Sequence, residues 1–122
     1  MGVKLAWPHR PVVALLGDGA ALYGIQGLWT EAHHNIPVVF LIANNAQYKI
    51  LKVIGAEMQL PQVLQGKYLG MDLVGPEVDF VGLSRSLGVE ACRVTEPDEL
   101  SERVRDALNR TEPILLDVTI ER

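Results

Sequence analysis

The sequence predicts an α/β fold, a doubly wound parallel sheet with helices on both faces. Short apolar runs rich in β-branched residues alternate with segments of helical periodicity. The resulting order, β-α-β-α-α-β-α-β, is typical of a parallel sheet with right-handed crossovers. In such sheets, ligands bind beyond the carboxyl ends of the strands. The chain has 122 residues, so we expect a single domain over residues 1–122.

The first half of the chain is expected to hold two strands and two helices. Residues 11–17, PVVALLG, form a β-branched run behind a proline and are read as a buried parallel strand. Residues 37–43, PVVFLIA, form the second strand. Residues 20–35 lie between them and follow helical spacing. The apolar stripe of this helix consists of Ala21, Leu22, Ile25, Leu28, Trp29 and Ala32. Residues 47–58 predict a second helix, with Ile50, Leu51 and Ile54 on one side.

The second half begins with a segment that has no clear periodicity. Residues 59–78 carry three glycines and two prolines, so we expect a loop with at most one helical turn. Beyond it a helix, a strand, a helix and a strand are predicted in that order, over residues 79–88, 89–94, 95–110 and 113–120. Gly88 is the expected stop of the first of these helices.

The helix over residues 95–110 has the clearest local signals. Thr95 and Asp98 stand at capping-box spacing, and Pro97 falls in the first turn, where no backbone N–H is needed. Glu99 and Arg103 form an i,i+4 pair of opposite charge. The apolar stripe consists of Leu100, Val104, Ala107 and Leu108.

Composition and charge narrow the function classes. An apolar fraction of 48% with 21% charged residues is typical of a soluble globular protein. The net charge of −4 argues against nucleic-acid binding, which needs a basic face. The apolar runs fall short of the roughly 20 residues that span a bilayer, and no signal peptide is recognisable. Cys92 is the one cysteine and is read as a buried structural thiol in a strand. These features predict a cytoplasmic protein that binds neither nucleic acid nor membrane.

Polar motifs follow the first two strands. GDG, residues 17–19, ends the first strand, and NN, residues 44–45, ends the second. Parallel strands aim both motifs at the same edge of the sheet. Asp18 offers an anionic oxygen and Asn45 a neutral amide oxygen, which are ligands that Mg²⁺ and Ca²⁺ accept. The sequence therefore predicts a cation site at this edge.

The glycines around Asp18 suggest an anion beside the cation. Gly17 and Gly19 carry no side chain, so a bulky group can approach the backbone. A helix that starts near Ala20 would direct free N–H groups to the same place, which suits an anion. Cation and anion together predict a diphosphate bound through a divalent metal.

The two motifs have other interpretations. Each motif alone is more often a plain turn, although their joint placement on successive strand ends makes coincidence less frequent. A dinucleotide fingerprint would need a third glycine at position 22, where Leu22 stands, and an acidic residue where Asn44 and Asn45 stand. A nucleotide-binding regulatory module of another superfamily stays open as an alternative.

The motif pair resembles the fingerprint of thiamine-diphosphate-dependent enzymes. Asp18 and Asn45 are 27 positions apart, as 45 − 18 shows. The flanking stretches RPVVALLGDGAALYGIQGLWTEAHHNIPVVFLIANNAQYKIL and DFVGLSRSLGV are similar to the diphosphate-binding, C-terminal domain of benzoylformate decarboxylase and its relatives. The similarity extends over nearly all of the chain.

The resemblance implies roles for particular residues. Asp18, Asn45 and the backbone carbonyl of Gln47 would bind Mg²⁺ or Ca²⁺ together with the diphosphate. The residues that would contact thiamine diphosphate are Gly17, Asp18, Gly19, Ala20, Asn45 and Tyr48. The residues that would wall the pocket of a 2-oxo acid with an apolar or aromatic tail are Ile50, Leu51 and Ile54. A role in core packing alone is the alternative for these three.

The resemblance also implies an incomplete enzyme. Family members have three domains, and this chain opens inside a helix of the diphosphate-binding domain, so the domain is expected to be truncated at its N-terminus. The activating glutamate belongs to another domain, and no catalytic residue is expected in this chain. We therefore expect the cofactor-anchoring part of a decarboxylase (a carboxy-lyase) or carboligase, inactive alone. An acetolactate-synthase-like carboligase part and a non-catalytic folded remnant are the alternatives.

The first predicted helix also raises the question of association. Gly24 and Gly27 lie about one turn apart on this helix, and because they carry no side chain, the backbone of a partner could approach closely there. Trp29 is a large apolar residue on the same helix. A truncated sheet edge would be a second contact surface. We expect a homo-oligomer with this helix or this edge in the contact. His33 and His34, adjacent on the same helix, are expected to be structural or superficial.

Overall fold

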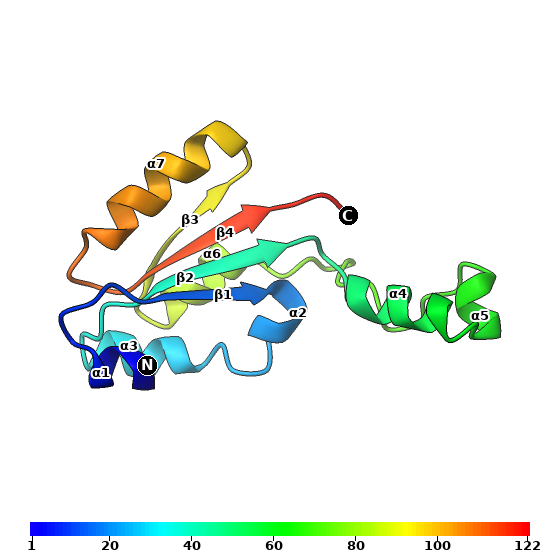
Figure 1. Ribbon diagram of the computed structural model, residues 1–122, viewed down its shortest axis with the longest axis horizontal. Helices are drawn as coiled ribbons and strands as arrows, with labels where there is room; N and C mark the ends of the chain where they lie inside the picture. The colour runs from blue at the N-terminus through cyan, green and yellow to red at the C-terminus, as the bar shows by residue number, and fades with distance from the viewer.

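Four parallel strands form the central sheet (Figure 1). The computed structural model describes all residues from 1 to 122. The strands are β1 (Val13–Gly17), β2 (Val39–Asn44), β3 (Glu90–Val94) and β4 (Ile114–Thr119). Their order in the sheet is β1-β2-β4-β3, and every pairing is parallel. The predicted α/β fold is therefore confirmed, and the predicted strand ranges contain the observed ones except for Asn44.

Seven helices accompany the sheet. They are α1 (Gly2–Ala6), α2 (Asp18–Ala21), α3 (Gly27–His33), α4 (Lys49–Glu57), α5 (Pro61–Leu64), α6 (Phe80–Ser86) and α7 (Pro97–Leu108). None of the seven has the length and apolar content needed to cross a membrane.

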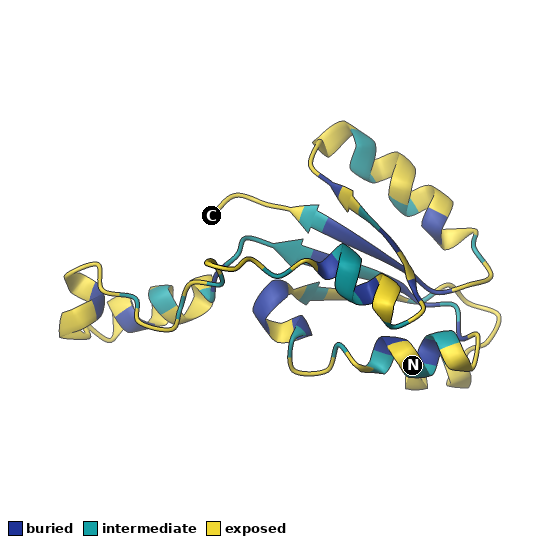
Figure 2. Ribbon diagram, turned by 180° about the vertical axis from the view of Figure 1, so that it is seen from behind, coloured by how far each residue is buried: buried dark blue, intermediate teal, exposed yellow.

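Helices cover both faces of the sheet, as predicted (Figures 1 and 2). On one face, α2, α3 and α6 enclose the larger core cluster, which consists of Ala21, Leu28, Ile42, Phe80, Val89, Ala91 and Leu115. On the other face, α7 contributes to a smaller cluster of Val39, Ala107, Ile114 and Leu116. Alternate residues of β2 and β4 thus serve opposite cores, as the pleat requires. Val13 and Leu15 of β1 are exposed, so the β1 end of the sheet is poorly covered.

The single helix predicted over residues 20–35 is wrong in its continuity. The structure has two short helices, α2 and α3, joined by turns over residues 22–26. The backbone N–H groups of Tyr23, Gly24 and Gly27 each bond the carbonyl three residues back, at 2.9–3.2 Å, instead of four. Glycine is a poor helix former, so Gly24 and Gly27 weaken the α-helical pattern here.

Trp29 also departs from the predicted apolar stripe, since its side chain is exposed. Its ring stacks on His33, with the ring centroids 4.9 Å apart. His34 meets His33 edge to face at 4.8 Å. The other stripe residues are buried or pack against the larger core.

A projecting arm, residues 49–71, contains α4 and α5 (Figure 1). α4 confirms the helix predicted over residues 47–58, and α5 is the one helical turn allowed in the predicted loop. Gly55 packs directly under Val63, where an added Cβ would press on the valine side chain at 2.9 Å. Most other side chains of the arm are exposed.

The capping box predicted for α7 is wrong. The N-cap residue is Glu96, and no side chain caps the helix. A residue before proline avoids the α region, so Pro97 keeps Glu96 extended (φ −100°, ψ 128°) and leaves Thr95 outside the helix. The Glu99–Arg103 ion pair is confirmed at 2.7 Å. Gly88, with φ +86°, ends α6 as expected.

Candidate functional site

The two polar motifs lie at one edge of the sheet. In the β1–β2 ladder, Gly17 is paired with Ala43, so the two strands end level with each other. Asp18 begins α2 immediately after β1, and Asn44 is the last residue of β2. Residues 44–48, the metal loop, contain two of the three predicted ligands, Asn45 and Gln47.

The predicted ligands Asp18 and Asn45 meet at one backbone amide. The N–H of Gln47 donates to Asp18 Oδ2 and to Asn45 Oδ1, each at 3.2 Å. The other carboxylate oxygen, Asp18 Oδ1, accepts from the N–H of Gly19 at 2.8 Å. Asp18 is buried, with 4% exposure. Two side-chain oxygens from separate strand ends are thus held close to the Gln47 backbone.

The metal loop is shaped by a turn that the sequence did not predict. Asn44 Oδ1 accepts from the N–H of Ala46 at 3.1 Å, and Ala46 adopts a left-handed φ of +54°. The Asn44 amide donates to Asp117 Oδ1 at 2.9 Å. Arg93 Nε donates to the second oxygen of Asp117 at 3.0 Å. This network joins the metal loop to β4 and β3.

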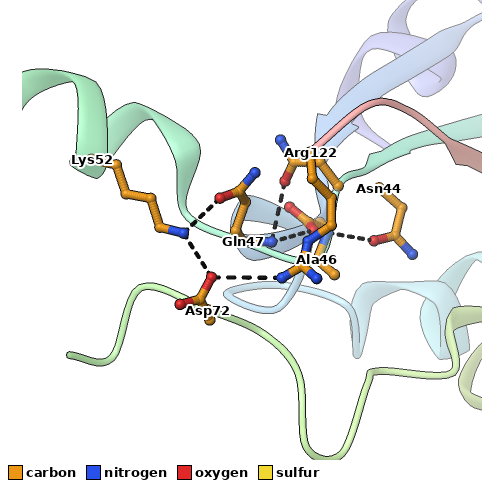
Figure 3. Close-up of polar contacts among 8 residues, drawn as sticks. Asn44, Ala46, Gln47, Lys52, Asp72 and Arg122 are labelled. Atoms are coloured by element: carbon orange, nitrogen blue, oxygen red, sulfur yellow. Dashed lines mark hydrogen bonds and ion pairs between the residues drawn. The ribbon is translucent and has the colours of Figure 1, made fainter. Parts of the chain in front are cut away.

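A second polar network fastens the loop from the side of the arm (Figure 3). The backbone of Tyr48 donates to Met71, and that of Leu73 donates to Ala46, at 2.7 and 2.8 Å. Lys52 Nζ donates to Gln47 Oε1 at 2.7 Å and to Asp72 Oδ1 at 2.6 Å. The same ammonium lies 4.5 Å from the centroid of the Tyr68 ring, and Arg122 lies 3.6 Å from Asp72. Sequence patterns gave no signal for Lys52 and Asp72, because these two residues are 20 positions apart and Arg122 is further still from Asp72.

The two glycines of GDG face different surroundings. A Cβ at Gly19 would collide with the Tyr48 ring, so the bulky group that approaches this backbone is a side chain of the same protein. A Cβ at Gly17 would meet no heavy atom within 4 Å. Ala20, the next residue of α2, is exposed. The open backbone is therefore at Gly17 and Ala20, while Gly19 lets Tyr48 pack against α2.

The predicted substrate-pocket residues lie on α4 with exposed side chains. They are Ile50, Leu51 and Ile54. Core packing therefore does not account for them. A hollow of about 430 Å³ on the same arm is lined by other residues, namely Leu60, Pro61, Gln62, Val63, Lys67, Leu69 and Met71.

The cysteine and the histidine pair discussed in the sequence lie away from this edge. Cys92 is a free, half-buried thiol on β3, and burial raises its pKa above the ordinary value. His33 and His34 end α3. No group of three or more His, Cys, Asp and Glu side chains is placed to hold a metal.

The predicted ligands at this edge of the sheet suit a hard cation and a phosphate. They are one carboxylate, one amide oxygen and one backbone carbonyl, from Asp18, Asn45 and Gln47, with no nitrogen or sulfur ligand. Mg²⁺ and Ca²⁺ prefer such oxygens, and Mg²⁺ keeps further positions for phosphate and water. The residues present therefore fit a magnesium–diphosphate group.

The chain is similar to enzymes of known family. A family model described as "Thiamine pyrophosphate enzyme, C-terminal TPP binding domain" matches residues 1–118. Benzoylformate decarboxylase of Pseudomonas aeruginosa is 35% identical over 118 residues, which cover 97% of this chain and 21% of that enzyme. The putative acetolactate synthase large subunit IlvX of Mycobacterium tuberculosis is 36% identical over 126 residues, covering 98% of this chain and 24% of that protein.

A solved structure shows the same fold. The thiamine diphosphate-dependent 4-hydroxybenzoylformate decarboxylase of Rhodococcus jostii RHA1 superposes with a TM-score of 0.85 at 34% identity. The match covers 98% of this chain and 21% of that one. The chain thus spans about a fifth to a quarter of the length of these relatives.

Proposed function

Since the chain belongs to the thiamine pyrophosphate enzyme family, through the C-terminal domain that binds the cofactor, we propose that it anchors thiamine diphosphate through a divalent cation in an enzyme acting on a 2-oxo acid. The observation that carries this proposal is the meeting of Asp18 and Asn45 at the N–H of Gln47. An acidic and an amide oxygen from two successive strand ends are held together there, at the edge where such sheets bind ligands.

Each residue of the site has a proposed task. Asp18, Asn45 and the Gln47 carbonyl hold Mg²⁺, or Ca²⁺ in its place. The residues that line the diphosphate and the adjoining part of the cofactor are Gly17, Asp18, Gly19, Ala20, Asn45 and Tyr48. The open backbone at Gly17 supports close approach by a phosphate. When bound, the cofactor supplies carbanion stabilisation for cleaving a bond next to the 2-oxo carbonyl, and the protein supplies position and electrostatics.

Two reactions fit the proposal equally well. Relatives include a benzoylformate decarboxylase, which is a carboxy-lyase, and a putative acetolactate synthase, which is a carboligase. We propose that Ile50, Leu51 and Ile54 wall the substrate pocket in either case. Their exposure on α4 supports this, since exposed apolar side chains are available to a substrate or a neighbouring domain.

The isolated chain is proposed to be inactive. The resemblance assigns the activating glutamate to another domain of family enzymes, and general acid–base help is typically worth about 10²–10⁴ in rate. Adding the remaining domains of a family enzyme should restore turnover if the chain is an enzyme part, and should not if it is a non-catalytic remnant. A homo-oligomeric state and a cytoplasmic location, the latter suggested by the unpaired Cys92, belong to the same proposal.

Calorimetry tests the cofactor assignment. We expect thiamine diphosphate to bind when Mg²⁺ is present and to lose affinity in EDTA, because the diphosphate would be held mainly through the metal. Asp18→Ala should weaken binding at least about 10-fold, the lower end of what changes around metal ligands cost. Ala20→Ser should change it little.

A matched control separates metal binding from helix capping. Asp79 is another carboxylate at a helix start; its Oδ1 accepts from the N–H of Gly82 at 3.0 Å, and it makes no hydrogen bond to the metal loop. Asp79→Ala should lower thermal stability and leave cofactor binding unchanged. Equal binding with and without EDTA would contradict the proposal.

A further inference from the structure

We propose that Asp117 is a positioning residue for the metal loop and that it acts through the side-chain amide of Asn44. The proposal concerns how the loop is held, and it rests on the proposed function for its consequence in metal binding. Asp117 itself makes no side-chain hydrogen bond to any of the predicted ligands. It reaches them through one asparagine that is not a predicted ligand.

Asp117 is a carboxylate in an unusual place. It lies on β4, a central strand, paired in register with Ile42 of β2 and Arg93 of β3. Its exposure is 0%. Burying a carboxylate is costly unless it is paired and hydrogen-bonded. Both oxygens are used here, one by Arg93 and one by Asn44, so the charge is held at a specific orientation.

The Asp117 carboxylate determines which way the Asn44 amide faces. A carboxylate only accepts hydrogen bonds, so the NH₂ group of Asn44 must face Asp117. The amide oxygen then faces the opposite way and accepts from the N–H of Ala46. A flipped amide would place its oxygen against the Asp117 carboxylate and its NH₂ group against the N–H of Ala46, and both bonds would be lost.

The hydrogen bond from Ala46 to Asn44 connects the orientation of the Asn44 amide to the predicted metal ligands. An asparagine oxygen that accepts from the N–H two residues on stabilises a turn, and Ala46 sits in that turn at φ +54°. The turn delivers the next N–H, that of Gln47, to Asp18 and Asn45. A chain of contacts thus runs from Asp117 through Asn44 and Ala46 to the predicted metal ligands.

The competing explanation is that Asp117 only joins β3 to β4 through Arg93. The Arg93 side chain is 48% exposed, so this half of the pairing is open to solvent. The two explanations differ in what Arg93→Met does. If Asp117 positions the loop, removing Arg93 leaves the Asn44 bond in place. If Asp117 serves the strand pair, Arg93→Met and Asp117→Leu should have the same effects.

Amide hydrogen exchange on the cofactor-free chain tests the positioning directly. We expect Asp117→Leu to accelerate exchange at Ala46 and Gln47 about 10-fold relative to the amides of β2. Asp117→Asn should rescue most of the protection, because an amide oxygen can still accept from Asn44. Arg93→Met should leave both amides near wild type.

Ser84→Ala is the matched control for the loss of a buried hydrogen bond. Ser84 is fully buried and donates to the carbonyl of Val89 at 3.1 Å, at the start of β3 and away from the metal loop. The Ser84→Ala substitution should lower overall stability without a selective increase in the exchange rates of the Ala46 and Gln47 amides. Unchanged exchange in Asp117→Leu, or the same acceleration in Arg93→Met, would overturn the proposal.

The binding measurement adds the functional consequence. With thiamine diphosphate present, Asp117→Leu should lower Mg²⁺ affinity about 10- to 100-fold, the range found for partners of metal ligands. Arg93→Met and Ser84→Ala should bind as wild type, and wild-type affinity in Asp117→Leu would overturn the proposal. If the wild-type chain binds no cofactor, the proposed function fails and the exchange data still decide the positioning.

A second variant covers the case in which Asp117→Leu does not fold. Asn44→Ala removes the connection and leaves the Asp117–Arg93 pair intact. It should accelerate exchange at Gln47, whose own bonds to Asp18 and Asn45 are not removed by the substitution. Wild-type protection of Gln47 in Asn44→Ala would overturn the proposal.

Discussion

Glu31 of α3 is a buried carboxylate remote from the metal loop. Its exposure is 3%, and its Oε2 atom has no hydrogen-bond partner. The terminal amine of Met1 lies 3.0 Å from Oε1. Burial raises the pKa of Glu31 above its ordinary value of 4.5, and the nearby amine opposes part of this rise. The folded state therefore holds the proton of Glu31 more tightly than the unfolded state does.

Glu31→Gln should stabilise the protein at neutral pH and not in acid. Below pH 4.5 the carboxyl is protonated in both states, so burial carries no charge penalty. As the pH rises through the raised pKa, the folded wild type must bury a charge and loses stability. The variant should gain about 1 kcal/mol at pH 7, the usual scale of single substitutions. Thermal unfolding from pH 4 to pH 8 measures this, and a pH-independent difference would contradict it.

The positions of single site residues could be predicted where a local sequence pattern marks them. Asp18 and Asn45 stand directly after apolar strands, so their common edge follows from parallel pairing alone. Asp117 gives no such signal, because it lies inside a strand and its partner Asn44 is 73 residues away. The Gly19–Tyr48 contact was missed for the same reason, since the two residues belong to different crossovers.

At the scale of elements, the attachment of the arm to the sheet depends on a single lysine, which the helical pattern of α4 did not indicate. Lys52 joins α4 to Gln47 of the metal loop and to Asp72 of the returning segment, and it lies over Tyr68. Because few side chains of the arm are buried, these polar contacts and the Tyr48–Met71 and Leu73–Ala46 backbone bonds hold it to the sheet.

Lys52→Met should loosen the arm without unfolding the sheet. The loss of charge-assisted hydrogen bonds costs about 1 kcal/mol or more, which raises the open population roughly fivefold. Chymotrypsin should then cut faster after Tyr68 or Leu69, because proteolysis follows the open population. Lys49→Met is the matched control, since Lys49 is exposed on the same helix. Equal cleavage rates in the two variants would contradict a role for Lys52.

Element existence was predictable, but element continuity was not. The period of apolar residues over residues 20–35 is helical, yet two glycines let the backbone tighten into turns between α2 and α3. At α7, the spacing of Thr95 and Asp98 suggested a capping box, but the conformational effect of Pro97 on Glu96 took precedence. Backbone preferences of single residues thus decided where helices begin and break.

For the whole molecule, the fold class follows from the alternation of strands and helices. The strand order β1-β2-β4-β3 does not, because several parallel orders share the same sequence of elements. The structure also reveals how unevenly the sheet is covered. α7 packs over β3 and β4, whereas Leu15 of the edge strand β1 is 72% exposed. Pattern alone marks β1 as buried on both faces and cannot show that one is bare.

This bare face leads us to expect self-association of the chain. An edge strand offers unpaired backbone groups, and exposed apolar patches favour partners. Light scattering over a concentration series should give masses above the monomer value of 13.4 kDa. Leu15→Lys should shift the mass toward the monomer, while Leu69→Lys, a matched change on the exposed arm, should not. Added Cβ atoms at Gly24, in the turns before α3, and at Gly27, the first residue of α3, meet nothing within 4 Å, so α3 and the turns before it are the rival contact. An effect of Gly27→Leu without one of Leu15→Lys would place the contact on α3, and a monomer at every concentration would refute association altogether.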